Sequence, residues 1–92
     1  MAQEQTSMAI TLYVLRSRCS GKRYVGITNN LARRLREHSR GKTKAGEILS
    51  DFKVVYTEDF ADHAAARARE KALKGGQGRR WLDEVEEGSW PA

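Results

Sequence analysis

The hydrophobic pattern favours strands in the first third of the chain and near its middle. Ala9 to Leu15 is rich in aliphatic and β-branched residues, and a second such run begins at Arg23, after a Cys-Ser-Gly-Lys turn. Two runs around a glycine-containing turn predict an antiparallel hairpin. Phe52 to Glu58 has the aromatic and β-branched content of a third strand. The register stays open, because a slip of one residue exchanges the two faces of a strand.

A basic amphipathic segment follows the hairpin. Residues 28–30, Thr-Asn-Asn, can each cap a helix by accepting from first-turn N–H groups. Leu31, Leu35 and His38 then share one helix face, and Arg34 lies on the edge of that face. We therefore expect a helix that turns one guanidinium toward the core side.

The second half of the chain predicts further helices. Asp62 to Lys74 has strong helix propensity, with Asp62 as the cap and Gly75–Gly76 as the stop. Glu70 shares a face with Ala66 and Leu73, so we expect its carboxylate on the core side.

Shorter helical segments and the chain ends complete the prediction. A last helix is expected over Arg79 to Glu86, and Glu47 to Ser50 is expected to form one helical turn. We expect residues 1–8 to be a disordered lead-in, 9–87 a single domain and 88–92 a frayed end. The predicted class is α+β: a three-stranded antiparallel sheet packed with three or more helices.

Charge is unevenly distributed along the 92 residues. Lys and Arg number 17 against 12 Asp and Glu, and the segment from Arg16 to Lys44 holds ten basic residues and one acid, Glu37. Four acids lie between Asp83 and Glu87. The basic segment suits a polyanion, of which nucleic acid is the commonest in a cell. A merely solubilising charged surface is the alternative.

The single cysteine, Cys19, excludes an intrachain disulfide and a cysteine metal site built from this chain alone. The first ten residues lack a basic segment followed by a long apolar run, and no stretch is apolar enough to cross a bilayer. We therefore expect a cytoplasmic protein that is neither exported by that route nor membrane-spanning.

Two hairpin tyrosines, an arginine, a histidine and a late glutamate complete a family pattern. Thr11-Leu12-Tyr13 and Tyr24-Val25-Gly26 resemble the two strand motifs of the GIY-YIG nuclease family. The resemblance extends to Arg34, His38 and Glu70, and covers roughly residues 11–82. Thr11 and Leu12 stand where the family has glycine and isoleucine, and the asparagine that some members carry after the glutamate has no clear counterpart.

The resemblance implies metal-dependent hydrolysis of a phosphodiester. Glu70 would bind one divalent cation, Mg²⁺ or alternatively Mn²⁺. Arg34 would neutralise charge on the scissile phosphate. Tyr13 or Tyr24 would take a proton from the attacking water, and His38 would relay a proton or position the other groups.

Six further basic residues are expected to hold flanking phosphates: Lys22, Arg23, Arg33, Arg36, Lys42 and Lys44. The expected activity is structure-specific or single-strand-directed cleavage of DNA in repair, recombination or processing, with specificity supplied by a loop, a homodimer or a protein partner. The form of the substrate stays open among single-stranded, branched and duplex DNA, and RNA. A non-catalytic nucleic-acid-binding module with a vestigial site is the alternative. A third possibility is a protein-interaction domain docked through Trp81, Trp90 and the acidic run.

Overall fold

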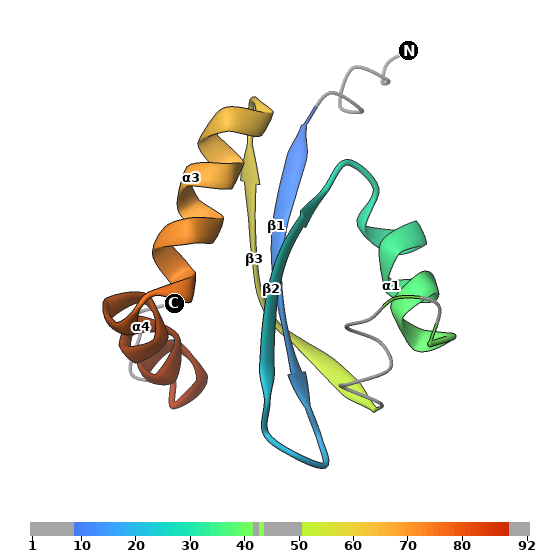
Figure 1. Cartoon of the computed structure of the whole chain (residues 1–92), viewed down its shortest axis with the longest axis vertical. Coiled ribbons are helices and arrows are strands. Elements are labelled where there is room, and N and C mark those ends of the chain that lie inside the picture. The colour runs from blue at the N-terminus through green and yellow to red at the C-terminus, as the bar shows by residue number, and fades with distance from the viewer. Residues whose placement is uncertain (1–8, 42, 44–50, 89–92) are drawn as a thin grey trace.

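The computed structural model describes residues 9–41, 43 and 51–88. Strands and helices form an α+β fold (Figure 1), which confirms the predicted class. The elements are β1 (Ile10–Ser17), β2 (Arg23–Thr28), α1 (Leu31–Ser39), β3 (Phe52–Phe60), α3 (His63–Lys74) and α4 (Gly76–Glu86).

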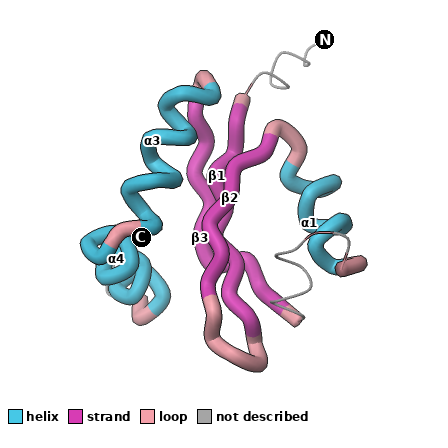
Figure 2. Tube along the Cα trace, viewed as in Figure 1, coloured by secondary structure: helices cyan, strands magenta, loops and turns pink. Residues whose placement is uncertain are grey.

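The three strands form one antiparallel sheet in the order β2-β1-β3, with β1 in the centre (Figure 2). The turn between β1 and β2 passes through Gly21 at φ 76°, a left-handed conformation that glycine adopts without steric cost. In the hairpin register Tyr13 pairs with Gly26 and Leu15 pairs with Tyr24. Both tyrosines therefore lie on the same face of the sheet.

Helices cover both faces of the sheet, with α1 on one side and α3 and α4 on the other (Figure 1). Alternation along the strands divides the core accordingly. The α3 and α4 face holds Leu12, Val14, Val25, Leu73 and Leu82, and the α1 face holds Tyr13 and Leu15, packed with Tyr24, Leu31, Leu35 and Phe52.

The predicted helix caps form as expected. Asn30 accepts from the N–H of Arg33 through its side chain, and Asp62 accepts from the N–H of Ala65. The strands β1 and β3 each run two residues past their predicted ends, to Ser17 and Phe60. Their pairing shifts register between Val14 and Leu15, an irregularity that the sequence pattern does not reveal.

The prediction that the last helix begins at Arg79 is wrong, because α4 begins at Gly76, directly after the Gly75 cap. Gly78 lies inside this helix, where a Cβ would run into the backbone of Ala72 and Leu73. The glycines in this segment therefore bring α4 close against α3 as well as ending α3.

Some predictions lie outside the described residues: the lead-in over 1–8, the helical turn over 47–50 and most of the frayed end. Within the described residues, no helix is long and apolar enough to cross a membrane.

Candidate active site

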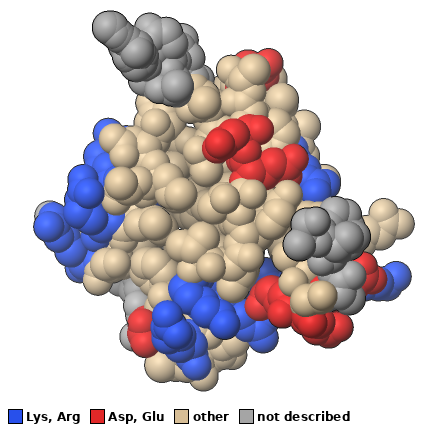
Figure 3. Space-filling view, turned by 180° about the vertical axis from the view of Figure 1, so that it is seen from behind, with Lys and Arg blue, Asp and Glu red and all other residues tan. Residues whose placement is uncertain are grey.

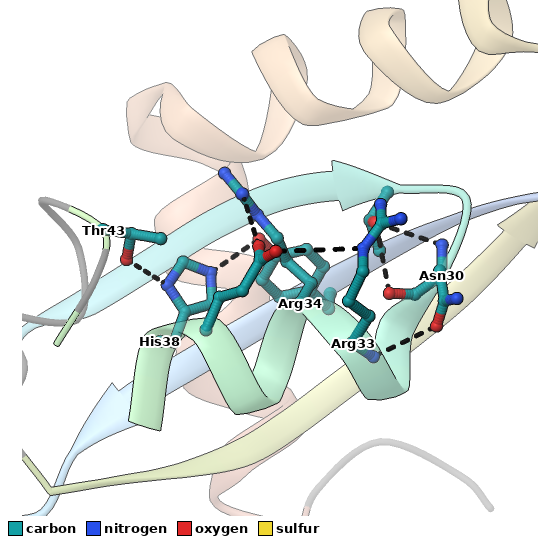
Figure 4. Close-up of polar contacts among 8 residues, drawn as sticks. Asn30, Arg33, Arg34, His38 and Thr43 are labelled. Atoms are coloured by element: carbon teal, nitrogen blue, oxygen red, sulfur yellow. Dashed lines mark hydrogen bonds and ion pairs between the residues drawn. The ribbon is translucent and has the colours of Figure 1, made fainter. Parts of the chain in front are cut away.

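A buried hydrogen bond joins the centre of the sheet to α1. Tyr13, on β1, has its hydroxyl 2.9 Å from His38 Nε2, in the last turn of α1. The two residues are 0 % and 1 % exposed. The other ring nitrogen of His38, Nδ1, lies 2.6 Å from the Thr43 hydroxyl oxygen (Figure 4). Both nitrogens of a buried imidazole are thus partnered, as buried polar groups must be.

Gly26 leaves room for the Tyr13 ring. A Cβ at this position would lie 2.7 Å from the Tyr13 hydroxyl oxygen and 2.9 Å from a ring carbon of Tyr24. Such contacts are too close for any real side chain, so the glycine at the end of the Tyr-Val-Gly motif is required by the packing of the two phenols.

Tyr24 joins the same cluster from the neighbouring strand. Its ring centroid lies 6.0 Å from that of Tyr13 and 5.4 Å from that of His38, and the ring is half-buried. Phe52 of β3 also packs against the imidazole, with its ring centroid 6.2 Å from that of His38. The register that the sequence left open is thus one that brings the two phenols together.

Arg34 lies between this cluster and solvent. Its side chain is 37 % exposed, its Nη1 donates to Glu37 Oε1 at 3.0 Å, and its guanidinium also interacts with the Tyr13 hydroxyl. Burial raises the pKa of Tyr13 to about 12, although the guanidinium acts in the opposite direction. Tyr13 is therefore a phenol in the free protein at neutral pH.

The environment of His38 favours neutral imidazole. Burial lowers the pKa of His38 and the nearby Arg34 cation lowers it further, while Glu37 opposes both effects. A neutral imidazole keeps one nitrogen free to accept a proton, which a phenol beside it can supply.

Glu70 occupies a different layer, because α3 covers the opposite face of the sheet (Figure 1). Its side chain is 13 % exposed, and its carboxylate lies 3.1 Å from Lys74 Nζ and 3.9 Å from an Arg67 nitrogen. The carboxylate is thus held toward the protein by ion pairs within its own helix. Tyr13, Tyr24, Arg34 and His38 gather on the α1 face, and Glu70 does not join them there.

A cleft of about 460 Å³ lies between β2 and the two C-terminal helices. Tyr24 lines it on the strand side, and Lys74, the ion-pair partner of Glu70, lines it on the helix side. The edge of β2 is therefore where the two layers of predicted site residues approach one another.

The residues offer a limited set of metal donors. Within the described residues, no group of three or more His, Cys, Asp or Glu side chains could hold a metal ion. The Glu70 carboxylate is a hard oxygen donor and retains some exposure. It suits Mg²⁺, which keeps several waters and often takes only one or two protein carboxylates together with substrate phosphate oxygens.

The residues predicted to bind nucleic acid fall into three groups. Lys22, Arg33 and Arg36 are exposed. Arg23 is half-buried, and its guanidinium lies 2.6 Å from Asp83 and 2.8 Å from Glu86 of α4. Lys42 and Lys44 lie outside the described residues. In Figure 3, Lys and Arg side chains gather on the α1 side and again toward the hairpin end, with uncharged surface between them.

Sequence reasoning missed two features of this site. Thr43 carried no signal, because a threonine in a polar, glycine-punctuated loop is unremarkable in sequence. The pairing of Arg23 with α4 had a signal in the opposite charges of the basic segment and the acidic run. Which cations the acids would neutralise depends on the packing of α4 beside the hairpin.

Comparison with known proteins places these residues in a family. A model described as the GIY-YIG catalytic domain matches residues 9–81, most of the chain. No curated protein and no solved structure matches it. The matched family is one of endonucleases. With its paired tyrosines, its helical arginine and histidine and its three-stranded sheet, the chain belongs to the GIY-YIG family.

Proposed function

We propose that this protein is a metal-dependent endonuclease that hydrolyses phosphodiester bonds in DNA. The observation that carries the proposal is the buried Tyr13–His38 hydrogen bond beside Arg34 and Tyr24. Burying a phenol and an imidazole next to a guanidinium is less favourable than burying apolar side chains. The arrangement suits proton transfer next to developing negative charge.

Each member of the cluster has a role in this chemistry. A phosphodiester repels nucleophiles through its own charge, and the forked donors of Arg34 neutralise that charge as the phosphorus becomes pentacovalent. Tyr13 acts as the general base, since it has a proton acceptor 2.9 Å away in His38. Tyr13 O–H gives its proton to His38 Nε2, and the resulting phenolate, facing Arg34, takes a proton from the attacking water. Tyr24 packs beside this pair and orients it.

Glu70 would hold the metal ion, Mg²⁺ or alternatively Mn²⁺, on the β2 edge. When bound, such an ion polarises a phosphate oxygen and lowers the cost of negative charge in the transition state. Lys74 and Arg67 form ion pairs with the Glu70 carboxylate. A metal ion that binds this carboxylate would have to displace one or both of these ion pairs. This exchange makes metal binding weaker than at an unpaired carboxylate.

The exposed cations Lys22, Arg33 and Arg36 would hold flanking phosphates, joined by Lys42 and Lys44 from the loop after α1. Phosphate contacts carry no sequence information, so we propose a substrate chosen by structure, single-stranded or branched DNA, in repair, recombination or processing. Sequence specificity would need a second copy of the chain or a protein partner. An exposed free cysteine, Cys19, is compatible with the reducing cytoplasm that we propose as its location.

One observation favours a second candidate function. The single predicted metal ligand, Glu70, is neutralised by Lys74 and Arg67 and lies on the opposite face of the sheet from Tyr13 and His38. A non-catalytic nucleic-acid-binding module would keep the basic surface of α1 and need no metal. The two functions differ in whether bound DNA is cut.

A cleavage assay on single-stranded, duplex and branched DNA, with Mg²⁺, Mn²⁺ or EDTA, separates them. An endonuclease cuts at least one form with a divalent ion and none with EDTA. Tyr13→Phe removes the proton that passes to His38 and should abolish cleavage while binding persists. Binding to every form with no cleavage in either metal would establish the non-catalytic module.

A further inference from the structure

The imidazole of His38 is held from both sides, and one of its partners has no role in the chemistry described above. Nε2 faces the Tyr13 hydroxyl at 2.9 Å, and Nδ1 faces Thr43 Oγ1 at 2.6 Å (Figure 4). Thr43 reaches this position because Gly41, at φ 71°, turns the chain back after α1, with its N–H donating to the carbonyl of His38 at 3.0 Å. Thr43, four residues after the last residue of α1, thus lies against the ring.

The direction of these hydrogen bonds follows from the donors available. The Arg34 guanidinium can only donate, so its influence on the Tyr13 hydroxyl is exerted on the oxygen of that group. The Tyr13 side chain is fully buried, and its own O–H proton therefore needs an acceptor within the protein. His38 Nε2 lies at hydrogen-bond distance from this hydroxyl, 2.9 Å, and it can accept the proton when it is itself unprotonated. In a neutral imidazole the proton accordingly sits on Nδ1 and is donated to the Thr43 oxygen.

We infer that Thr43 is a positioning residue: its hydroxyl oxygen accepts the Nδ1 proton of His38 and so fixes the tautomer whose Nε2 can take the proton of Tyr13. Without this acceptor, the proton can move to Nε2, and the ring would then donate to Tyr13. In that tautomer the Tyr13 hydroxyl oxygen would accept from His38 Nε2–H, and His38 could no longer accept the Tyr13 proton. The effect of Thr43 on DNA cleavage rests on the proposed function, whereas its effect on the tautomer of His38 does not.

The other groups around the ring support the neutral form that this arrangement needs. Arg34 faces it from α1 and disfavours a second proton, Glu37 acts in the opposite direction, and Tyr13 and Tyr24 face it from the sheet. Phe52 contributes only an apolar ring from β3. Thr43 is thus the partner that selects between the two neutral tautomers.

The test compares Thr43→Val, which removes the hydroxyl, with Thr43→Ser, which keeps it. Correlation spectra that link the imidazole nitrogens to the ring protons report the tautomer of each histidine in the intact chain without DNA. The chain has two histidines, and His63 is exposed at the start of α3, so it serves as an internal reference. We expect His38 to be protonated at Nδ1 in the wild type and in Thr43→Ser, and to shift toward the Nε2 form in Thr43→Val, with His63 unchanged.

The same three proteins are then compared in single-turnover cleavage of DNA at saturating enzyme. We expect Thr43→Val to lower the rate by about 10- to 100-fold, the scale seen when the partner that orients a functional imidazole is removed, with DNA affinity unchanged. Thr43→Ser should recover most of the rate. An unchanged His38 tautomer in Thr43→Val, or a serine variant that behaves like the valine variant, would overturn the inference. Absence of cleavage by the wild type would refute the proposed nuclease activity. The role of Thr43 would then be decided by the His38 tautomers of the three proteins.

Discussion

At the scale of single residues, the α1 face of the sheet contains polar side chains where a purely structural core would place aliphatic ones. Tyr13 and His38 are both fully buried, and the polar ends of their side chains meet each other inside a cluster of Leu15, Leu31 and Leu35. A buried hydroxyl or imidazole destabilises the fold by a few kcal/mol unless it is fully hydrogen-bonded. The hydrogen bond between Tyr13 and His38 avoids that loss of stability. Apolar residues of similar size would also avoid it, and they would need no precise hydrogen-bond geometry. Polar groups at such core positions are expected where they serve a site.

Arg34 is expected to act on the transition state more than on binding, because it interacts with the Tyr13 hydroxyl while Arg33 and Arg36 of the same helix are exposed. Arg34→Ala should lower the single-turnover rate by about 10²-fold or more, the size of effect seen when one preorganised donor is removed. Its DNA affinity should change little.

Arg33→Ala is the matched control, because Arg33 is exposed and its ion pair with Glu37 is long, at 3.9 Å. It should weaken DNA binding modestly and leave turnover nearly unchanged. Affinity would be measured in Ca²⁺ and rates in Mg²⁺. Equal effects of the two substitutions on both quantities would mean that α1 is only a basic surface.

His38 should make folding stability depend on pH in a defined direction. Its pKa is lowered in the folded protein by burial and by Arg34, so the unfolded chain, with an ordinary value of about 6.5, takes up the proton first as the pH falls. The contribution of neutral His38 to the free energy of unfolding is therefore complete above about pH 6.5 and is lost below it.

Urea unfolding of the wild type and of His38→Gln, from about pH 7.5 to about pH 5, measures this effect. The stability advantage of the wild type should shrink across that interval. His63→Gln, at an exposed position, is the control for replacing a histidine outside the core. A wild-type advantage over His38→Gln that grows as the pH falls would show that the folded protein favours the imidazolium.

At the scale of elements, the sequence predicted those features that depend on a few neighbouring residues. The caps at Asn30 and Asp62, the hairpin and the helical face of Leu31 and Leu35 follow from local chemistry and periodicity, and all of them form. The start of α4 was missed, because Gly75–Gly76 was interpreted only as a helix stop. Gly75 does end α3, but α4 begins at the next residue, and Gly78 inside it allows close packing on α3.

The site shows the same division. Tyr13, Tyr24, Arg34 and His38, which the family motif and spacing grouped as a site, lie close together, since one hairpin and the helix after it are adjacent in sequence. The contact of Thr43 depends on how the loop returns to α1, and no local pattern encodes it. The layer in which Glu70 lies likewise depends on which sheet face α3 covers.

The packing of α4 on α3 can be tested at its glycines. A Cβ at Gly78 would collide with the backbone of Ala72 and Leu73, so Gly78→Ala must push the two helices apart. We expect a loss of about 1–3 kcal/mol, as for overpacking in a core, and a fall in the melting temperature of several degrees.

Gly76→Ala provides the control two residues earlier, because a Cβ there meets nothing within 4 Å. This substitution should be neutral or stabilise the helix by up to about 1 kcal/mol, since alanine has the higher helix propensity. Thermal unfolding followed by circular dichroism compares the two variants. A Gly78 variant as stable as the Gly76 variant would contradict the close packing of α3 and α4.

At the scale of the whole molecule, the ten-to-one ratio of basic to acidic residues between Arg16 and Lys44 overstates the unpaired basic surface, because acids outside that segment pair with some of its arginines. Arg16 and Arg23 both pair with Glu86, and Arg23 also pairs with Asp83, while Arg18 pairs with Asp51. The Nε of Arg23 and Oε2 of Glu86 are buried and lie 2.8 Å apart without forming an aligned hydrogen bond. Arg16 and Arg23 hold the hairpin to α4, and under the proposed function the exposed cations of α1 are the ones that contact DNA.

The salt dependence of DNA binding should therefore distinguish the two sets of arginines. Arg36 is exposed on α1, and Arg36→Ala should weaken binding and reduce the slope of log affinity against log salt by about 1, the loss of one phosphate contact. Arg23→Ala should leave the slope nearly unchanged and lower stability instead, since it leaves Asp83 and Glu86 without their partner. Equilibrium binding at several salt concentrations, with thermal unfolding alongside, gives both quantities. A slope that falls equally for both variants would place Arg23 on the DNA.

A substitution at Glu70 tests the metal site that we propose on α3. Glu70→Gln keeps the size of the side chain but removes the charge that a hard cation needs, so Mg²⁺-dependent cleavage should fall to background. The same change releases Lys74, now 3.1 Å from the carboxylate and lining the cleft beside Tyr24. DNA binding should consequently stay the same or become slightly tighter, because one more cation is free to meet a phosphate.

Glu87→Gln is the matched control, since it removes the same charge from an exposed residue at the end of α4. It should leave the cleavage rate unchanged, so a rate loss confined to position 70 cannot come from net charge alone. Cleavage rates across a range of Mg²⁺ concentrations complete the comparison, because a weakened metal site that survives the substitution would recover at high Mg²⁺. If the Glu70 variant cleaves at a near wild-type rate at low Mg²⁺, then α3 holds no catalytic metal, and the chemistry rests on the α1 face alone.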